Sequence, residues 1–204
     1  MPCPRLAPVA RSALLVAALT AFAPAVARSG DVYRVDPERT SVAFAVTQLG
    51  VFEQNGRFGR VHGRILYDPG KESGSVDLVV DTNSVDTGWD LRDRFIESTN
   101  MLDAANHPQL EFRSTAMSFV AHRLVAIEGA LTLRGVTRPV RFDVRSLRCG
   151  PAPSAGDDRC EAKIVGRISR RAFGVDYGYP LVGDDVQLTF AVSAERLPAD
   201  IAGR

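Results

Sequence analysis

The side chains best suited to chemistry are few in this sequence and lie far apart. The histidines His62, His107 and His122 form neither the His-x-His nor the His-Glu-x-x-His spacing that holds a metal. The sequence has no Gly-x-Ser-x-Gly turn of a hydrolase and no glycine-rich phosphate loop with its lysine. The acidic pairs at 157–158 and 184–185 fall in turn-like segments, where carboxylates are ordinarily solvated. We therefore expect neither a catalytic residue nor a metal site.

Arg92 is the candidate for a polar contact with a ligand, and the segment around it predicts how it is held. Residues 84–115 interrupt the alternation of apolar and polar residues that runs through the rest of the chain. Leu91 and Phe95 lie four residues apart, and Arg92 and Ile96 repeat that spacing, so a short helix is predicted. One helix in a protein of strands would close or line a part of the fold.

Two roles are open for Arg92. Its planar guanidinium suits carbonyl and phosphate oxygens, so it could bind the head group of a ligand at the mouth of a cavity. Alternatively, Arg92 could form an ion pair with Asp86 or Asp93 that anchors the helix to the rest of the fold. Trp89 could stack over a ligand, although a single Trp on a helix more often packs against protein. Asp86 or Thr87 is expected to cap the helix.

Outside this segment the chain predicts eight short strands, each with one apolar and one polar face. They are expected at 42–46, 58–67 with a bulge near Gly59, 76–80, 110–114, 125–133, 140–144, 162–168 and 186–192. Closing these strands into a barrel removes the two exposed edges that an open sheet would leave. The predicted fold is all-β, an eight-stranded antiparallel barrel with one short helical insertion. Such a barrel is either filled by side chains or holds one small ligand.

Small residues on or beside the inward faces favour the hollow form of this barrel. They are Gly63, Ala126, Gly129, Ala162 and Gly166. A sealed core would need more side-chain volume at these positions. Glycine also marks bends at barrel corners, so the indication is weak.

The first 27 residues have the features of a cleaved secretory signal peptide. Arg5 and Arg11 form a basic start, residues 12–23 are an apolar run, and Ala25-Val26-Ala27 is a cleavage site. The run is shorter than the roughly 20 residues of a membrane span. Cleavage leaves residues 28–204, which suit one domain, and we expect that domain to be exported as a free soluble protein.

The charge and cysteines of the mature chain are consistent with an exported binding domain. Losing two of the 25 basic residues leaves 23 against 24 acidic ones, so no basic stripe for nucleic acid is expected. Cys149 and Cys160 remain, an even pair around the turn-rich segment GPAPSAGDDR, which predicts a disulfide. Closing a loop of this size stabilises a fold by about 3 kcal/mol in the chain-entropy model.

Five groups of motifs follow one another along nearly the whole mature chain. They are Tyr33-x-Val35-Asp36-Pro37 with Ser41-x-x-Phe44-x-Val46; Gly56-Arg57-Phe58 with Gly63-x-Ile65-x-Tyr67-Asp68; Ser84-Val85-Asp86-Thr87 with Arg92-Asp93, Met101-Leu102-Asp103 and His107-Pro108-x-x-x-Phe112-x-Ser114-Thr115; Gly129-x-Leu131-Thr132-Leu133-x-Gly135-Val136-Thr137-x-Pro139-Val140; and Arg170-x-x-Phe173-Gly174-Val175. In this order and at this spacing they resemble the YceI-like family of bacterial periplasmic proteins.

The resemblance implies a lipocalin-like barrel whose elongated apolar tunnel holds a long isoprenoid lipid, such as a polyprenyl or a ubiquinone-like quinone. It implies no required cofactor beyond that bound lipid. Two positions depart from the family pattern. Gln48 stands where many members have His, and residues 95–98 replace a His-Leu-Arg-Ser run. Both changes remove polar or basic character near the helix.

A tunnel for such a lipid needs only apolar side chains. Each buried CH₂ is worth about 0.8 kcal/mol, so ten give roughly 8 kcal/mol against several kcal/mol of association cost. The candidates to line the tunnel are Phe44, Val46, Phe58, Ile65, Leu78, Val80, Trp89, Phe95, Phe112, Ile127, Leu131, Phe142, Ile164, Phe173, Leu188 and Phe190. Ordinary core packing would account for any single one of them.

The predicted function is therefore transport, storage or sequestration of an isoprenoid lipid in the periplasm, by a non-enzymatic monomer or homodimer. Transient contact with a membrane, or with a membrane protein that handles quinones or isoprenoids, belongs to this hypothesis. Two alternatives stay open. One is a filled barrel acting as a secreted interaction or adhesion module, and the other is an enzyme acting on a small amphiphile. Convergent polar groups with shifted pKa values inside the cavity would favour the enzyme.

Overall fold

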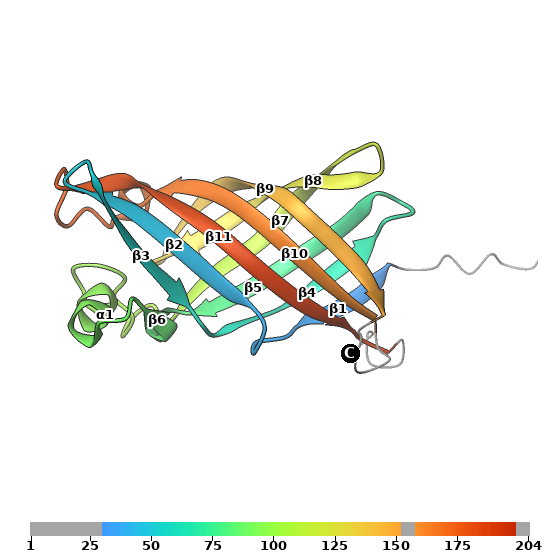
Figure 1. Cartoon of the computed structure of the whole chain (residues 1–204), viewed down its shortest axis with the longest axis horizontal. Helices are drawn as coiled ribbons and strands as arrows, with labels where there is room; N and C mark the ends of the chain where they lie inside the picture. The colour runs from blue at the N-terminus through green and yellow to red at the C-terminus, as the bar shows by residue number, and fades with distance from the viewer. Residues whose placement is uncertain (1–29, 152–157, 199–204) are drawn as a thin grey trace, which may run out of the picture.

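The computed structural model describes residues 30–151 and 158–198, and the predicted signal peptide at 1–27 lies outside these residues. The described residues form an antiparallel β-barrel with one short α-helix (Figure 1). Its elements are β1 (Asp31–Val35), β2 (Ser41–Gln48), β3 (Phe52–Phe58), β4 (Val61–Asp68), β5 (Ser73–Asp81), η1 (Thr82–Ser84), β6 (Val85–Asp86), α1 (Asp90–Glu97), β7 (Gln109–Val120), β8 (Arg123–Leu133), β9 (Val136–Pro151), β10 (Asp158–Ser169), η2 (Arg171–Phe173) and β11 (Val182–Arg196).

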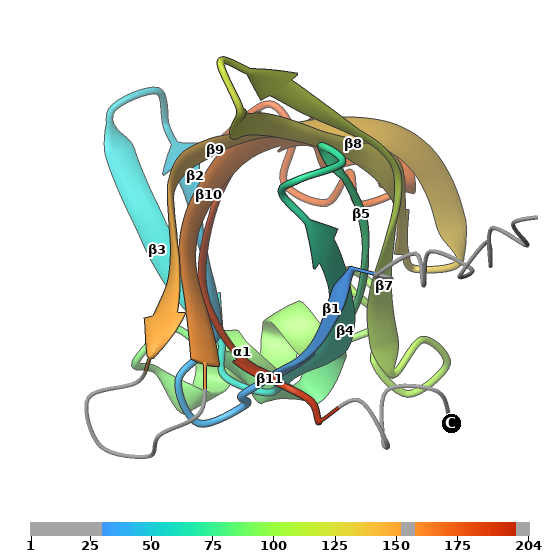
Figure 2. The same cartoon turned by 90° about the vertical axis from the view of Figure 1, so that its right-hand side faces the viewer.

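Eight strands close the barrel. They follow one another in the order β1-β4-β5-β7-β8-β9-β10-β11, and β1 pairs back to β11 to complete the ring. Figure 2 shows this ring nearly end-on, with α1 at its far end. All the pairings are antiparallel, so the predicted eight-stranded antiparallel barrel is confirmed.

The strands β2, β3 and β6 extend the wall of the barrel beside α1. β11 pairs with β2 over its first ten residues and with β1 over its last three, so β1 and β2 share one edge of β11. The prediction of a single bulged strand over 58–67 was wrong, because strand β3 ends at Phe58 and a separate strand, β4, begins at Val61. β3 pairs with β2 and β6, whereas β4 pairs with β1 and β5. Strand β1 was not predicted, yet it closes the ring.

The helix α1 forms where the alternation stops, as predicted, and lies at one end of the barrel (Figure 1). The expected cap was wrong. Trp89 occupies the N-cap position without a side-chain hydrogen bond. Asp93 instead accepts hydrogen bonds from the backbone N–H (2.9 Å) and the hydroxyl (2.5 Å) of Thr87. The helix is therefore tied back to the segment before it by a residue of its first turn.

The inward glycines make room for side chains of the protein itself. Gly166 lies directly across from Phe142, and a Cβ at Gly166 would lie 2.3 Å from that ring. A Cβ at Gly129 would lie 2.6 Å from the ring of Phe112, and one at Gly63 would lie 2.8 Å from Cδ2 of Leu78. The expectation that these glycines leave space for a ligand was therefore wrong.

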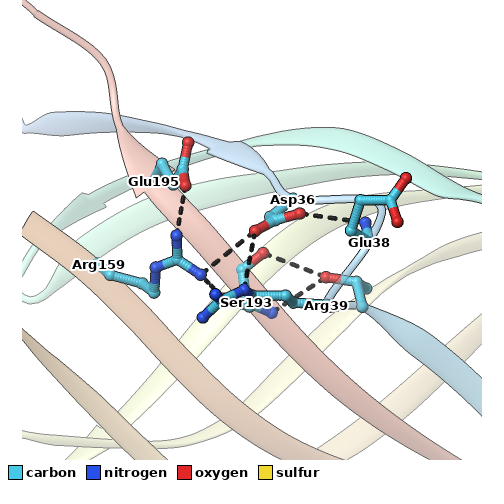
Figure 3. Close-up of polar contacts among 7 residues, drawn as sticks. Asp36, Glu38, Arg39, Arg159, Ser193 and Glu195 are labelled. Carbon is cyan, nitrogen blue, oxygen red and sulfur yellow. Dashed lines mark hydrogen bonds and ion pairs between the residues drawn. The ribbon is translucent and has the colours of Figure 1, made fainter. Parts of the chain in front are cut away.

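A polar cluster fastens the connection between β1 and β2 to β11 (Figure 3). The guanidinium of Arg159, largely buried, donates to Asp36 (3.2 Å) and to the Ser193 hydroxyl (3.2 Å), and it also pairs with Glu195. The hydroxyl of Thr40 donates to the carbonyl of Ser193 (3.1 Å) and accepts from its N–H (3.0 Å). These contacts hold the point where β11 changes partner from β2 to β1.

The predicted disulfide between Cys149 and Cys160 is present. The two residues face each other across β9 and β10, with their Cα atoms 4.1 Å apart. The bond therefore joins two strands that are already paired, close to the connection between them.

Candidate functional site

Two cavities of very different size lie inside the barrel that the described residues form. The large cavity, of about 410 Å³, lies at the end that carries α1. Its volume falls within the range of roughly 300–1,000 Å³ that is usual for small-molecule sites. The small cavity, of about 50 Å³, lies towards the other end and is lined by residues such as Tyr33, Met117 and Leu124. The large cavity is therefore the candidate binding site.

A layer of three aromatic rings separates the two cavities. Phe142 packs edge-on against Phe112 and against Phe190, with centroid distances of 5.4 Å and 4.9 Å. Along strand β8, Ile127 lines the small cavity and Leu131 lines the large one, and the ring of Phe112 lies against Gly129 between them. We call Phe112, Phe142 and Phe190 the aromatic layer. It ends the large cavity part of the way along the barrel.

The predicted lining residues divide between these regions. Nine line the large cavity: Phe44, Val46, Phe58, Val80, Trp89, Phe95, Leu131, Leu188 and Phe190. Four line the small cavity: Ile65, Leu78, Ile127 and Ile164. The remaining three border neither cavity: Phe112 and Phe142, in the aromatic layer, and Phe173, which is 1% exposed in the core. The alternation of apolar and polar residues predicts which side chains face inward, but it does not predict the level of each side chain along the barrel axis.

The large cavity reaches the surface at the α1 end. Trp89 and Tyr177 both line it, and more than half of each side chain is exposed. Most of the remaining wall is aliphatic or aromatic. Apolar residues that the sequence analysis did not select complete it, and they include Ile96, Met101 and Val186. An apolar chain could therefore enter from this end and lie along the barrel axis.

Arg92 provides a positive charge in the wall of the large cavity. Its Nε donates to the Thr87 hydroxyl (2.8 Å), its Nη2 donates to the Thr87 carbonyl (2.8 Å), and its Nη1 donates to the side-chain oxygen of Gln54. Among the described residues no carboxylate forms an ion pair with Arg92. The ion pair with Asp86 or Asp93, one of the two expected roles, is thus not formed. The guanidinium is oriented by neutral groups, and it also lies 5.7 Å from the ring centroid of Trp89.

Arg170 is a second cation of the cavity wall, and the sequence analysis gave it no role. Its side chain is 5% exposed and donates to the backbone oxygens of Val175, Tyr177, Val182 and Gly183 at 2.7–2.9 Å. Burial lowers the pKa of this guanidinium. All three of its nitrogens donate hydrogen bonds to backbone carbonyls. Arg170 therefore shapes the segment between η2 and β11. Its place in the Arg170-x-x-Phe173 motif was the available signal.

Neutral polar groups complete the wall near the mouth. Gln48, Gln54, Asn55 and Thr87 line the cavity, and Gln54 and Thr87 accept hydrogen bonds from Arg92. The alternation of apolar residues gives no sign of these polar side chains. The arrangement has a long apolar body and one polar, positively charged region. Such a site suits an amphiphile with an oxygen-rich head, since neutral donors and a guanidinium both favour oxygen acceptors.

Residues 30–151 and 158–198 contain no group of three or more His, Cys, Asp or Glu side chains placed to hold a metal. In the same ranges no helix is long and apolar enough to span a membrane.

The chain is similar to known bacterial proteins over most of its length. A UPF0312 protein of Pectobacterium atrosepticum is 31% identical over 167 residues, which cover 80% of this chain and 86% of the relative. Protein YceI of Salmonella arizonae is 31% identical over 163 residues, or 78% of this chain and 84% of the relative.

Solved structures share the fold. BcnA of Burkholderia cenocepacia has a TM-score of 0.66 and 25% identity, covering 78% of this chain and 98% of that protein. A polyisoprenoid binding domain from Saccharophagus degradans, implicated in plant cell wall breakdown, has a TM-score of 0.62 and 18% identity, covering 81% and 98%. Residues 33–194 match the YceI-like domain. The chain, with its closed barrel, short helix and interior cavity, therefore belongs to the YceI-like family.

Proposed function

We propose that this protein is exported to the periplasm and binds an isoprenoid lipid, with a polyprenyl or quinone character, in the large cavity. The observation that carries the proposal is the cavity itself, about 410 Å³ of mainly apolar space that reaches the surface at one end. The name of one structural relative, a polyisoprenoid binding domain, supports the same class of ligand. Transport, storage or sequestration of the lipid follows from such binding without any catalytic step.

The polar end of the ligand lies near Arg92 in this proposal. Arg92 has no carboxylate partner among the described residues, so an oxygen-rich head group would supply the missing negative or partly negative charge. A quinone carbonyl and a phosphate both meet this requirement. The apolar chain would then extend inward along Phe58, Leu131 and Leu188 as far as the aromatic layer.

The proposal also limits how much chain the cavity accommodates. The aromatic layer lies across the barrel, and only the small cavity of about 50 Å³ lies beyond it. A short isoprenoid segment fits the space in front of the layer. A longer chain would leave part of its length outside the mouth or would require the rings to move.

Native mass spectrometry of the protein purified from its own host tests this function. We expect a discrete adduct that organic extraction releases as a polyprenyl or quinone species. The delipidated protein should then regain the same adduct when it is incubated with the extracted lipid. A clean apo mass that persists after incubation with polyprenyl and ubiquinone lipids would contradict the proposal and would favour a barrel that binds a protein partner.

A further inference from the structure

Large exposed hydrophobic side chains are concentrated in three segments of the described chain. Of eleven such residues among those described, only Leu66 and Val120 lie elsewhere. The other nine are Leu49, Val51 and Phe52 in the β2–β3 hairpin, Trp89, Leu91 and Phe95 in or beside α1, and Tyr177, Tyr179 and Leu181 before β11. We call these nine residues the apolar rim.

The three segments meet at one end of the barrel. The N–H of Leu49 donates to the carbonyl of Leu181 (2.6 Å), which joins the β2–β3 hairpin to the segment before β11. The rings of Phe95 and Tyr177 pack edge-on with centroids 4.9 Å apart, which joins that segment to α1. Figure 1 shows all three segments at its left-hand end. Residues distant in sequence thus form one exposed apolar surface.

The apolar rim is continuous with the wall of the large cavity. Trp89, Phe95 and Tyr177 belong to both, and Gln48 and Val182 line the cavity directly beside rim residues. A molecule that leaves the cavity at this end passes over the rim. A surface that surrounds the exit of an apolar cavity is placed to exchange its contents with a second apolar phase.

We propose that the apolar rim docks on the surface of a lipid bilayer, so that lipid passes between the bilayer and the large cavity. Exposing each CH₂ to water disfavours transfer about fourfold, and direct contact avoids that exposure. Trp89, Tyr177 and Tyr179 are of the types that prefer the membrane–water interface. Leu49 and Val51 lie in the turn between β2 and β3, and Leu181 lies in the segment before β11, so exposed aliphatic side chains come from two connections at this end.

Arginines beside the rim can contact the phosphate groups of a bilayer surface, although exposed acids, Glu53, Asp90 and Asp176, lie in the same segments. The guanidinium of Arg171 lies 4.0 Å from the ring centroid of Tyr179, and Arg94 is exposed in the last turn of α1. Both can reach phosphate oxygens while the neighbouring aromatic rings lie at the interface. The docking inference rests on the proposed function for the identity of the exchanged lipid, but not for the binding itself.

Flotation with vesicles of phosphatidylethanolamine and phosphatidylglycerol tests the inference. The test variant is Val51→Asp with Leu181→Asp, because these side chains are 78% and 61% exposed and line neither cavity. The matched control is Val120→Asp, which is 63% exposed at the end of β7, and Figure 1 shows the connection from β7 to β8 away from the α1 end. We expect the double variant to lose at least tenfold in vesicle binding and the control to match the wild type.

Further measurements separate this inference from the proposed function. Thermal unfolding should show that all three proteins are folded, and native mass spectrometry should show whether each retains the extracted lipid. Rim-dependent vesicle binding without any bound isoprenoid would uphold the docking and contradict the proposed function. Lipid retention with no vesicle binding, or with vesicle binding that the double variant preserves, would overturn the docking alone. A dimer in sedimentation that the double variant dissociates, without vesicle binding, would assign the rim to self-association and also overturn it.

Discussion

At the scale of single residues, the position of Arg92 shows how a charge is kept available in a largely apolar site. Thr87 and Gln54 orient its guanidinium through neutral oxygens, and Asp93 is engaged by Thr87 instead. A carboxylate partner would have neutralised the group and reduced its attraction for a ligand oxygen. The contacts therefore orient Arg92 without a carboxylate partner among the described residues.

Replacing Arg92 by Met should weaken the binding of a lipid with a polar head by about ten- to a hundredfold, because a hydrogen bond to a charged group is worth about 1.5–3 kcal/mol. Titration of the delipidated protein would measure this loss. The control is an isoprenoid hydrocarbon without a head group, whose affinity should hardly change. Equal losses for both ligands would show that Arg92 acts by shaping the cavity.

Gly166 is a residue whose small size the barrel requires, because Phe142 lies over it. Gly166→Ala should lower the free energy of unfolding by about 1–3 kcal/mol, since the added Cβ would lie 2.3 Å from the ring. Urea unfolding measures the change. Gly150→Ala is the matched control, because its Cβ would meet nothing within 4 Å, and it should change stability by less than about 0.5 kcal/mol. Equal effects would contradict this account.

At the scale of elements, the aromatic layer is built by three strands that contribute one ring each. β7 supplies Phe112, β9 supplies Phe142 and β11 supplies Phe190. The central ring, Phe142, is 2% exposed and contacts both others. The layer therefore joins opposite parts of the wall and also determines the depth of the large cavity.

Phe142→Ala should join the two cavities and allow a longer isoprenoid chain to bind, at a cost of about 3–5 kcal/mol in stability. Competition between isoprenoid lipids of increasing length, followed by native mass spectrometry, would detect the change in preference. Phe173→Ala removes an equally buried ring that lines neither cavity, so it should lose stability without altering the length preference. An unchanged preference in Phe142→Ala would show that the layer does not limit the ligand.

At the scale of the whole molecule, the cavity and the ring of strands are energetically linked. A ligand that binds only the closed barrel stabilises it by about 2.7 kcal/mol when its concentration is a hundred times Kd. For a domain of this size each kcal/mol shifts Tm by about 2–4 °C. A lipid bound in the cavity, as proposed above, would therefore contribute to the stability of the entire fold.

Removing the lipid should accordingly lower Tm by roughly 5–10 °C. Differential scanning calorimetry of the native and the delipidated protein would measure the difference. Adding back the extracted lipid should restore the higher Tm, whereas the carrier solvent or detergent alone should not. Identical Tm values in all these samples would mean that the barrel is stabilised by its own side chains only.

The sequence by itself determined the class of fold and the place of its one helix. Apolar and polar residues alternate with the period of a strand, and the interruption at 84–115 marks α1. The disulfide between Cys149 and Cys160 could also be predicted, because the two cysteines are only 11 residues apart in the sequence. The motif order was enough to suggest the family.

Only the tertiary structure decided how deep each inward residue lies and what it contacts. Alternation reports whether a side chain faces inward, but its level along the barrel depends on the register and tilt of strands that are remote in sequence. Phe112 and Phe142 therefore lie in the aromatic layer that separates the two cavities, whereas Leu131 lines the large cavity. The closing strand β1 and the neutral partners of Arg92 likewise depend on long-range pairing, which local patterns do not record.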